Sequence, residues 1–156
     1  MTKQATISKK YKLEDYESLI REVTSAGGKF RIYPKGVSML PLVRGKKDSV
    51  ILTAPDKPVV GDIILYRRVS GYALHRIVDK DENGFVCCGD NQNFNEYGIA
   101  PEQIIAKVAA IYRGKYRISN DNILYRVYTK IMIWRVRVRG LAKRLKHFFA
   151  PKREAT

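Results

Sequence analysis

Residue types that can perform acyl transfer occur in order along the first two thirds of the chain. Ser38 comes first, His75 follows, and the carboxylates of Asp90 and Glu96 come after it. A serine hydroxyl is a weak nucleophile until a neighbouring base takes its proton, and histidine can do so near neutral pH. A carboxylate at the other ring nitrogen would orient the imidazole and stabilise its protonated form. The set therefore predicts nucleophilic catalysis by Ser38 with His75 as the general base.

Each of these residues also has an ordinary structural explanation. A serine before Met-x-Pro is usually a loop residue, and a single histidine in a strand is usually packed in the protein. Gly-Asp-Asn is a common turn sequence whose aspartate bonds to nearby backbone. The only other histidine, His147, lies in the basic C-terminal region, where a solvated or lipid-facing position is the default. The ordered combination, and not any single residue, favours catalysis.

Four short motifs around these residues resemble the signal peptidases, within the clan that they share with self-cleaving SOS-type repressors. The motifs are, in order, Gly36-Val37-Ser38-Met39-Leu40-Pro41, Gly61-Asp62-Ile63, His75-Arg76-Ile77 and Gly89-Asp90-Asn91. The resemblance covers roughly residues 30–113, and a histidine in the third motif is similar to the archaeal and endoplasmic-reticulum type. It implies a serine endopeptidase that needs no metal or organic cofactor, with Ser38 as nucleophile and His75 as general base.

The third catalytic member stays open between two residues. The family has one aspartate in the Gly-Asp-Asn motif, which matches Asp90, and another several residues later, where this chain has Glu96. The oxyanion site also departs from many bacterial members, which carry a serine two residues before the nucleophile. Gly36 occupies that position, so an oxyanion would depend on backbone N–H groups, including that of Ser38.

The segments that must hold these residues are mainly β. A helical pattern runs from Leu13 to Val23 and stops at Gly27-Gly28. Strand patterns follow at 30–33, 50–52, 63–66, 72–78, 85–88 and 104–112, with turns at Ser70-Gly71 and Asn83-Gly84. We therefore expect a mainly β fold of the signal-peptidase/SOS-repressor type with an N-terminal helix. The expected division is 1–28 (helical segment), 29–118 (catalytic domain) and 119–156 (basic helical tail).

The tail carries most of the positive charge. Residues 113–156 contain thirteen Lys and Arg against two acidic residues, a net +11, whereas the first 112 residues carry +4. Apolar residues recur at helical spacing, at Leu124, Val127/Tyr128, Ile131, Trp134, Val138, Leu141, Leu145 and Phe148/Phe149. Asn120 or Asp121 is the expected helix cap, and a break at Gly140 into two helices is as well supported as one helix.

Three interpretations of this tail are open. Its apolar stripe packs on the β body, or it lies on an anionic membrane surface, or it contacts a partner protein. Nucleic acid is a weaker interpretation, because no recognised binding motif accompanies the charge.

Composition excludes several classes of protein. Cys87 and Cys88 are adjacent, which is poor for a disulfide, and no zinc-type spacing occurs, so a reducing compartment is expected. No run of about 18 apolar residues predicts a membrane span, and residues 1–12 have no secretory pattern. The 37 residues before Ser38 also lack the apolar anchor that most signal peptidases carry there.

The expected function is cleavage of a peptide or protein precursor, in the cytoplasm or at a membrane surface. The alternatives are a self-cleaving repressor-like protein and a non-catalytic binding module. Ala26-Gly27 resembles the bond that such repressors cut, although it lies only 11 residues before Ser38.

Overall fold

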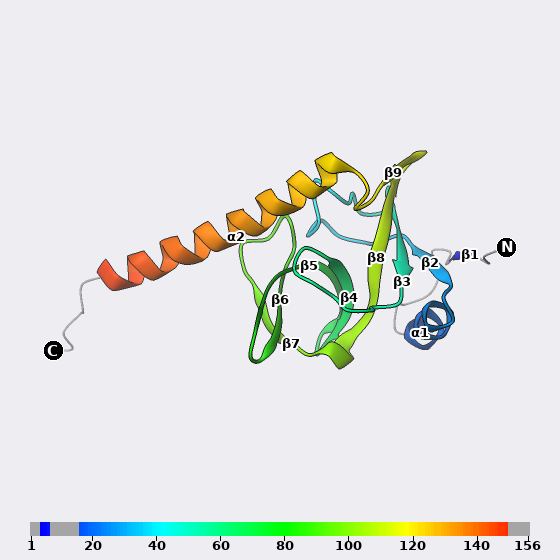
Figure 1. Ribbon diagram of the computed structural model, residues 1–156, viewed down its shortest axis with the longest axis horizontal. Helices are drawn as coiled ribbons and strands as arrows, with labels where there is room; N and C mark the ends of the chain where they lie inside the picture. The colour runs from blue at the N-terminus through cyan, green and yellow to red at the C-terminus, as the bar shows by residue number, and fades with distance from the viewer. Residues whose placement is uncertain (1–3, 7–15, 150–156) are drawn as a thin grey trace.

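The computed structural model describes residues 4–6 and 16–149, and the side chains of residues 16–142. In this part of the chain, a mainly antiparallel sheet of nine strands has a short helix before it and a long helix after it (Figure 1). The elements are β1 (Gln4–Thr6), α1 (Glu17–Ser25), β2 (Lys29–Ile32), β3 (Ser49–Thr53), β4 (Ile63–Arg68), β5 (Gly71–Asp81), β6 (Gly84–Cys88), β7 (Glu96–Ile99), the 3-10 turn η2 (Pro101–Gln103), β8 (Ile104–Arg113), β9 (Tyr116–Ile118) and α2 (Ile123–Phe149). The expectation of a mainly β chain with a helix at each end is confirmed.

The strand order brings the chemistry-bearing segments together. The sheet runs β1-β2-β3-β8-β4-β5-β6-β7, with β9 pairing with β8. Only β1 and β2 pair in parallel; the other pairs are antiparallel. The strands β4, β5, β6 and β7 are consecutive in sequence and in space, so His75 on β5 and Glu96 on β7 belong to one meander.

Two of the strands that the sequence did not predict have recognisable physical causes. β7 reads Glu-Tyr-Gly-Ile, and only Ile99 of its residues is buried, so it has no alternating apolar pattern. It forms because β6 offers a free edge, with Cys87 opposite Glu96. β9 has three residues and closes a short hairpin onto the end of β8. Both strands come from pairing rather than from intrinsic propensity.

The main core lies between α1 and one face of the sheet. Ile20 of α1 is fully buried there with Phe30 of β2, Leu52 of β3 and Ile105 of β8. Each such apolar side chain contributes roughly 1.5–3 kcal/mol when buried. The predicted helix is thus present, with Leu13 outside the described residues. The division at 1–28, 29–118 and 119–156 stays a prediction.

α2 corrects two expectations about the tail. It is one continuous helix from Ile123 to Phe149, so the break considered at Gly140 does not occur. Its cap is neither Asn120 nor Asp121. Asn122 Oδ1 accepts hydrogen bonds from the backbone N–H groups of Leu124 (2.8 Å) and Tyr125 (3.3 Å), as an N-cap side chain does. Asp121 instead accepts from the side chains of Ser119 and Arg117.

The face by which α2 packs is also not the predicted one. Tyr125 and Val136 are buried, and Val136 joins Val78, Val86 and Cys88 in a small cluster. Most of the predicted apolar stripe faces away from the sheet, because Leu124, Val127, Ile131, Trp134, Val138 and Leu141 are between 43% and 75% exposed. Of its other members, Tyr128 points inward to Asp90, and Leu145, Phe148 and Phe149 lie outside the residues whose side chains are described. The interpretation that this stripe packs on the β body is therefore wrong. The C-terminal half of the helix extends beyond the sheet (Figure 1).

Candidate active site

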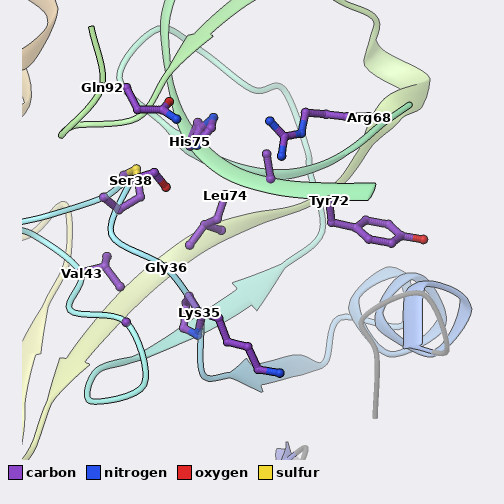
Figure 2. A pocket seen from close by; sticks show the side chains of 13 residues that line it. Lys35, Gly36, Ser38, Val43, Arg68, Tyr72, Leu74, His75 and Gln92 are labelled. Carbon is purple, nitrogen blue, oxygen red and sulfur yellow. The ribbon is translucent and has the colours of Figure 1, made fainter. Parts of the chain in front are cut away.

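Ser38 and His75 line the same surface pocket, of about 210 Å³. Its other lining residues come from the loop after β2 and from β5, with Arg68 at the end of β4 and Gln92 after β6. Figure 2 shows Ser38, His75 and Gln92 toward one end of the pocket, and Arg68 and Tyr72 toward the other. The residues predicted as nucleophile and base, 37 positions apart in sequence, are therefore brought to one cavity.

Two side chains contact Nδ1 of His75, and a third holds one of them in place. His75 Nδ1 lies 3.1 Å from Glu96 Oε1 and 3.0 Å from the hydroxyl of Tyr66. That hydroxyl donates to Glu96 Oε2 (2.9 Å), and Arg68 Nη1 donates to Glu96 Oε1 (3.1 Å). His75 is only 3% exposed. Its imidazole thus contacts a carboxylate that Tyr66 and Arg68 hold in place by hydrogen bonds.

These contacts decide which ring nitrogen carries the proton. The Tyr66 hydroxyl proton is used on Glu96, and an ionised carboxylate only accepts hydrogen bonds. His75 Nδ1 must therefore be the protonated nitrogen, donating toward Glu96 Oε1. In the neutral ring Nε2 then has a free lone pair. A histidine in this tautomer can accept a proton from a serine hydroxyl.

The charge environment favours neutral His75. Burial lowers the pKa of His75 below its usual 6.5, Glu96 opposes this by attraction and hydrogen bonding, and Arg68 lowers the pKa further. The net shift is downward, so the ring is a neutral proton acceptor at pH 7. Burial also raises the pKa of the Tyr66 phenol, which keeps that hydroxyl a donor.

The carboxylate of Asp90 pairs with Arg76 rather than with the imidazole of His75. Its carboxylate forms a two-pronged ion pair with Arg76, with Nε–Oδ1 at 2.9 Å and Nη2–Oδ2 at 2.8 Å. The two side chains are 0% and 1% exposed. Tyr128 and Thr129 of α2 complete the cluster: the Tyr128 hydroxyl donates to Asp90 Oδ2, and Thr129 Oγ1 accepts from Arg76. Of the two candidate acids, Glu96 contacts His75 Nδ1 and Asp90 holds Arg76.

The Gly-Asp-Asn motif also fixes the serine loop. The backbone N–H of Asn91 donates to Ser38 O (2.7 Å), and its side-chain amide donates to Val37 O (3.2 Å). Gly89 permits this approach, because a Cβ there would lie 2.7 Å from Ser38 O. One motif therefore anchors both Arg76, next to the base, and the backbone of the candidate nucleophile.

The backbone around Ser38 leaves donors for an oxyanion. Gly36 has φ 96°, a conformation that side-chain-bearing residues rarely adopt, and it turns the chain toward Ser38. Among the hydrogen bonds of the described residues, none uses the N–H of Ser38 or Met39. Unpaired N–H groups next to the candidate nucleophile are what an oxyanion site requires.

Sequence reasoning missed Tyr66 and Arg68 as site residues. Both lie on β4, and the β4–β5 register sets Ile64 opposite His75 and Tyr66 opposite Ala73. Residues two apart on a strand share a face, so the side chains of Tyr66 and Arg68 follow Ile64 on the face of His75. The available signal was a tyrosine and an arginine at alternate positions of a strand that begins with three aliphatic residues.

The sequence matches no protein-family model and no curated protein. No cluster of three or more His, Cys, Asp or Glu suited to a metal ion occurs among residues 4–6 and 16–149. Within the same part of the chain, no helix has the length and apolar character needed to cross a bilayer.

Proposed function

We propose that this protein is a serine endopeptidase that cleaves a peptide or protein precursor, with a fold of the signal-peptidase and SOS-repressor type. Ser38 is the nucleophile, His75 is the general base, and Glu96 orients the imidazole. Asp90 has a structural role through Arg76. The resemblance of the four motifs to those of signal peptidases supports the assignment of the class, and it implies small substrate side chains near the cut.

One observation carries the proposal. Ser38 and His75 line a single pocket. Glu96 and Tyr66 both contact His75 Nδ1, so the free lone pair of the neutral ring belongs to Nε2. A packed, non-functional histidine has no need for a partly buried carboxylate that is itself held by two donors. The arrangement has the chemical parts of a nucleophile–base–acid relay.

The proposed reaction uses only groups of this chain and water. Ser38 Oγ forms a bond to the scissile carbonyl carbon as its proton passes to His75 Nε2, and Glu96 stabilises the imidazolium. The carbonyl oxygen becomes an oxyanion that backbone N–H groups stabilise. The C–N bond then breaks, and His75 gives its proton to the leaving amine. Water, deprotonated by His75, hydrolyses the acyl-enzyme and restores the serine.

Where the enzyme acts is part of the same proposal. The composition favours a reducing compartment, and we place the activity in the cytoplasm or at a membrane surface. A self-cleaving protein is the second candidate, and it is tested separately below.

A peptide-library digestion tests this function. The purified protein is incubated with a peptide pool of cellular proteins, and new peptide ends are identified by mass spectrometry. We expect ends that wild type produces and that both Ser38→Ala and His75→Ala fail to produce. Ser70→Ala, which changes an exposed serine of the β4–β5 turn, is the matched control and keeps full activity. Cleavage by Ser38→Ala at the wild-type rate would show that the nucleophile is wrong.

A further inference from the structure

The outward face of α2 is an apolar stripe with no partner among the described residues. It consists of Leu124, Val127, Ile131, Trp134, Val138 and Leu141, which we call the exposed stripe. Trp134, the only tryptophan of the chain, is 65% exposed at its centre. Single exposed apolar residues are common, but six at helical spacing along one face indicate a surface that binds something.

The opposite face of the same helix explains why this stripe cannot turn inward. Tyr128 and Thr129 bond the Arg76–Asp90 pair, and Arg135 and Arg139 donate to backbone carbonyls of the loop between β6 and β7. Val136 is buried against Cys88 and its neighbours. Rolling α2 to bury the exposed stripe would break all of these contacts. The helix therefore has one face that packs on the β body and a second, apolar face that is directed outward.

Positive charge runs along the edge of the exposed stripe. Arg126, Lys130 and Arg137 are exposed, and their spacing of four and seven residues sets them on one side of α2. None of the three side chains has a hydrogen-bond or ion-pair partner in the part of the chain that the structure describes. The sequence 123–149 contains eight Lys and Arg and no acidic residue. A solvated helix usually mixes both signs, so a single sign points to an anionic partner.

We propose that α2 docks on an anionic membrane surface, parallel to the bilayer, with the exposed stripe inserted at the level of the lipid headgroups. Arg126, Lys130 and Arg137 then meet lipid phosphates at the edge of the inserted face. Tryptophan favours this depth, because its ring is apolar and its N–H can still reach a polar group. With eight Lys and Arg among its 27 residues, α2 suits the surface of a bilayer rather than its interior.

Charge and apolarity together select a lipid over other occupants. Nucleic acid offers phosphates but has no use for six adjacent apolar side chains. A second copy of this chain would bring the same positive helix against itself, and like charges at close range are repulsive. An anionic bilayer satisfies both features at once. This inference does not depend on the chemistry of Ser38.

Trp134 supplies the measurement, because every tryptophan signal of the protein comes from the exposed stripe. The full-length protein is titrated with vesicles of pure phosphatidylcholine and with vesicles containing phosphatidylserine, at low and high salt. We expect a blue shift of Trp134 emission and co-sedimentation with the anionic vesicles only, both weakened by salt. Bromine-labelled lipid chains should quench the emission.

Two matched pairs of variants separate insertion from adsorption. Lys130→Gln with Arg137→Gln should weaken binding to anionic vesicles roughly 25-fold, since each cation near the surface contributes about fivefold. The control, Lys47→Gln with Lys57→Gln, removes the same charge from exposed loop positions and should change binding little. Ile131→Ser with Leu141→Ser should abolish the quenching, whereas Val69→Ser with Tyr116→Ser, exposed apolar residues off the helix, should not.

Three results would overturn the proposal. The first is a protein that stays in the supernatant with anionic vesicles at low salt. The second is pelleting without a blue shift or quenching, which would mean adsorption by net charge alone. The third is a dimer in light scattering that Ile131→Ser with Leu141→Ser dissociates while vesicles have no effect, which would assign the exposed stripe to a second copy of the chain.

Discussion

The charge state of His75 depends on two neighbours with opposite effects. Burial lowers the pKa of His75, Glu96 raises it, and Arg68 lowers it again. Both neighbours touch each other through a 3.1 Å hydrogen bond, so the carboxylate that orients the ring is itself partly neutralised. This arrangement lets Glu96 hold His75 Nδ1 without keeping the ring protonated at neutral pH.

The first prediction concerns the pH profile of peptide cleavage. A general base acts only when it is deprotonated, so the rate rises with pH through the pKa of the base. Because the pKa of His75 is lowered, we expect the half-maximal rate below pH 6.5 and a flat profile between pH 7 and 8. A half-maximal rate clearly above pH 6.5, measured where chemistry limits turnover, would contradict the assignment.

The second prediction uses the two neighbours as opposite probes. Glu96→Gln removes an attraction that raises the pKa of His75, so the acid limb of the pH–rate profile should move to lower pH. The maximal rate at high pH should fall by roughly 10²–10⁴-fold. Arg68→Gln removes a repulsion, so the limb should move to higher pH. Arg67→Gln is the matched control, since Arg67 points to Glu17 at 3.9 Å and should leave the limb unchanged. Limbs that move together in both variants would refute this electrostatic account.

The third catalytic residue shows where sequence reasoning stops. By sequence Asp90 and Glu96 are equal candidates, because each matches one of the two acidic positions in the signal-peptidase-like pattern. The distinction arises from pairing: Cys87 on β6 lies opposite Glu96 on β7, which carries Glu96 back toward β5. β7 has no strand pattern of its own, so no reading of residue types could have located it.

At the scale of elements, the Arg76–Asp90 pair joins three parts of the molecule. Arg76 is on β5, Asp90 follows β6, and Tyr128 and Thr129 reach them from α2. Arg76 Nη1 also donates to Gly61 O (2.9 Å), which brings the second motif into the same cluster. Three of the four motifs therefore have a structural role here, and they position the serine loop and the base strand relative to each other.

The third prediction tests this structural role. Asp90→Asn leaves the Arg76 guanidinium buried without its counter-charge and should cost about 3–5 kcal/mol of unfolding free energy in urea titrations. Asp121→Asn, whose carboxylate is 80% exposed beside Arg117, should change stability by less than about 1 kcal/mol. Replacing both charges, as in Arg76→Met with Asp90→Leu, should recover most of the loss. Equal stabilities for Asp90→Asn and wild type would contradict it.

The α2 helix shows which sequence patterns were sufficient. Apolar residues at steps of three and four predicted a helix here, and α2 is one. They did not reveal the packed face, because the helix has two: the exposed stripe and a second face with Tyr125, Tyr128 and Val136. Which face turns inward depends on a hydrogen-bonding partner, the Arg76–Asp90 pair, that lies 35 to 60 positions away from those residues in the chain. Strands with an uninterrupted apolar run, such as Val50-Ile51-Leu52 in β3, needed no such partner and were predicted.

At the scale of the whole molecule, most of the positive charge and the proposed catalytic site occupy different parts. Residues 113–156 carry a net +11 and the preceding 112 residues +4, so the basic helix is attached to a nearly neutral β body. α1 and β2 belong to that body, because Ile20 and Phe30 are both 0% exposed in its main core. The link between them contains Ala26 and Gly27, the bond considered for self-cleavage.

The fourth prediction separates a peptidase acting on other molecules from a self-cleaving protein. Bringing the Ala26–Gly27 bond to Ser38 would require pulling α1 or β2 out of the main core, at a cost of several buried apolar side chains. We therefore expect the intact mass of 17.9 kDa to persist during long incubation at pH 7 to 9, as it does for Ser38→Ala. Fragments ending at Ala26 in wild type alone would favour self-cleavage.

The central claim is that Ser38 is a nucleophile activated by His75, and covalent labelling tests it most directly without a known substrate. The protein is treated with a fluorophosphonate probe, and the modified residue is located by peptide mass spectrometry. We expect one adduct, on Ser38, whose formation slows by at least about 100-fold in His75→Ala while Ser70→Ala is labelled like wild type. No adduct on Ser38, or an adduct that forms equally fast without His75, would contradict the claim.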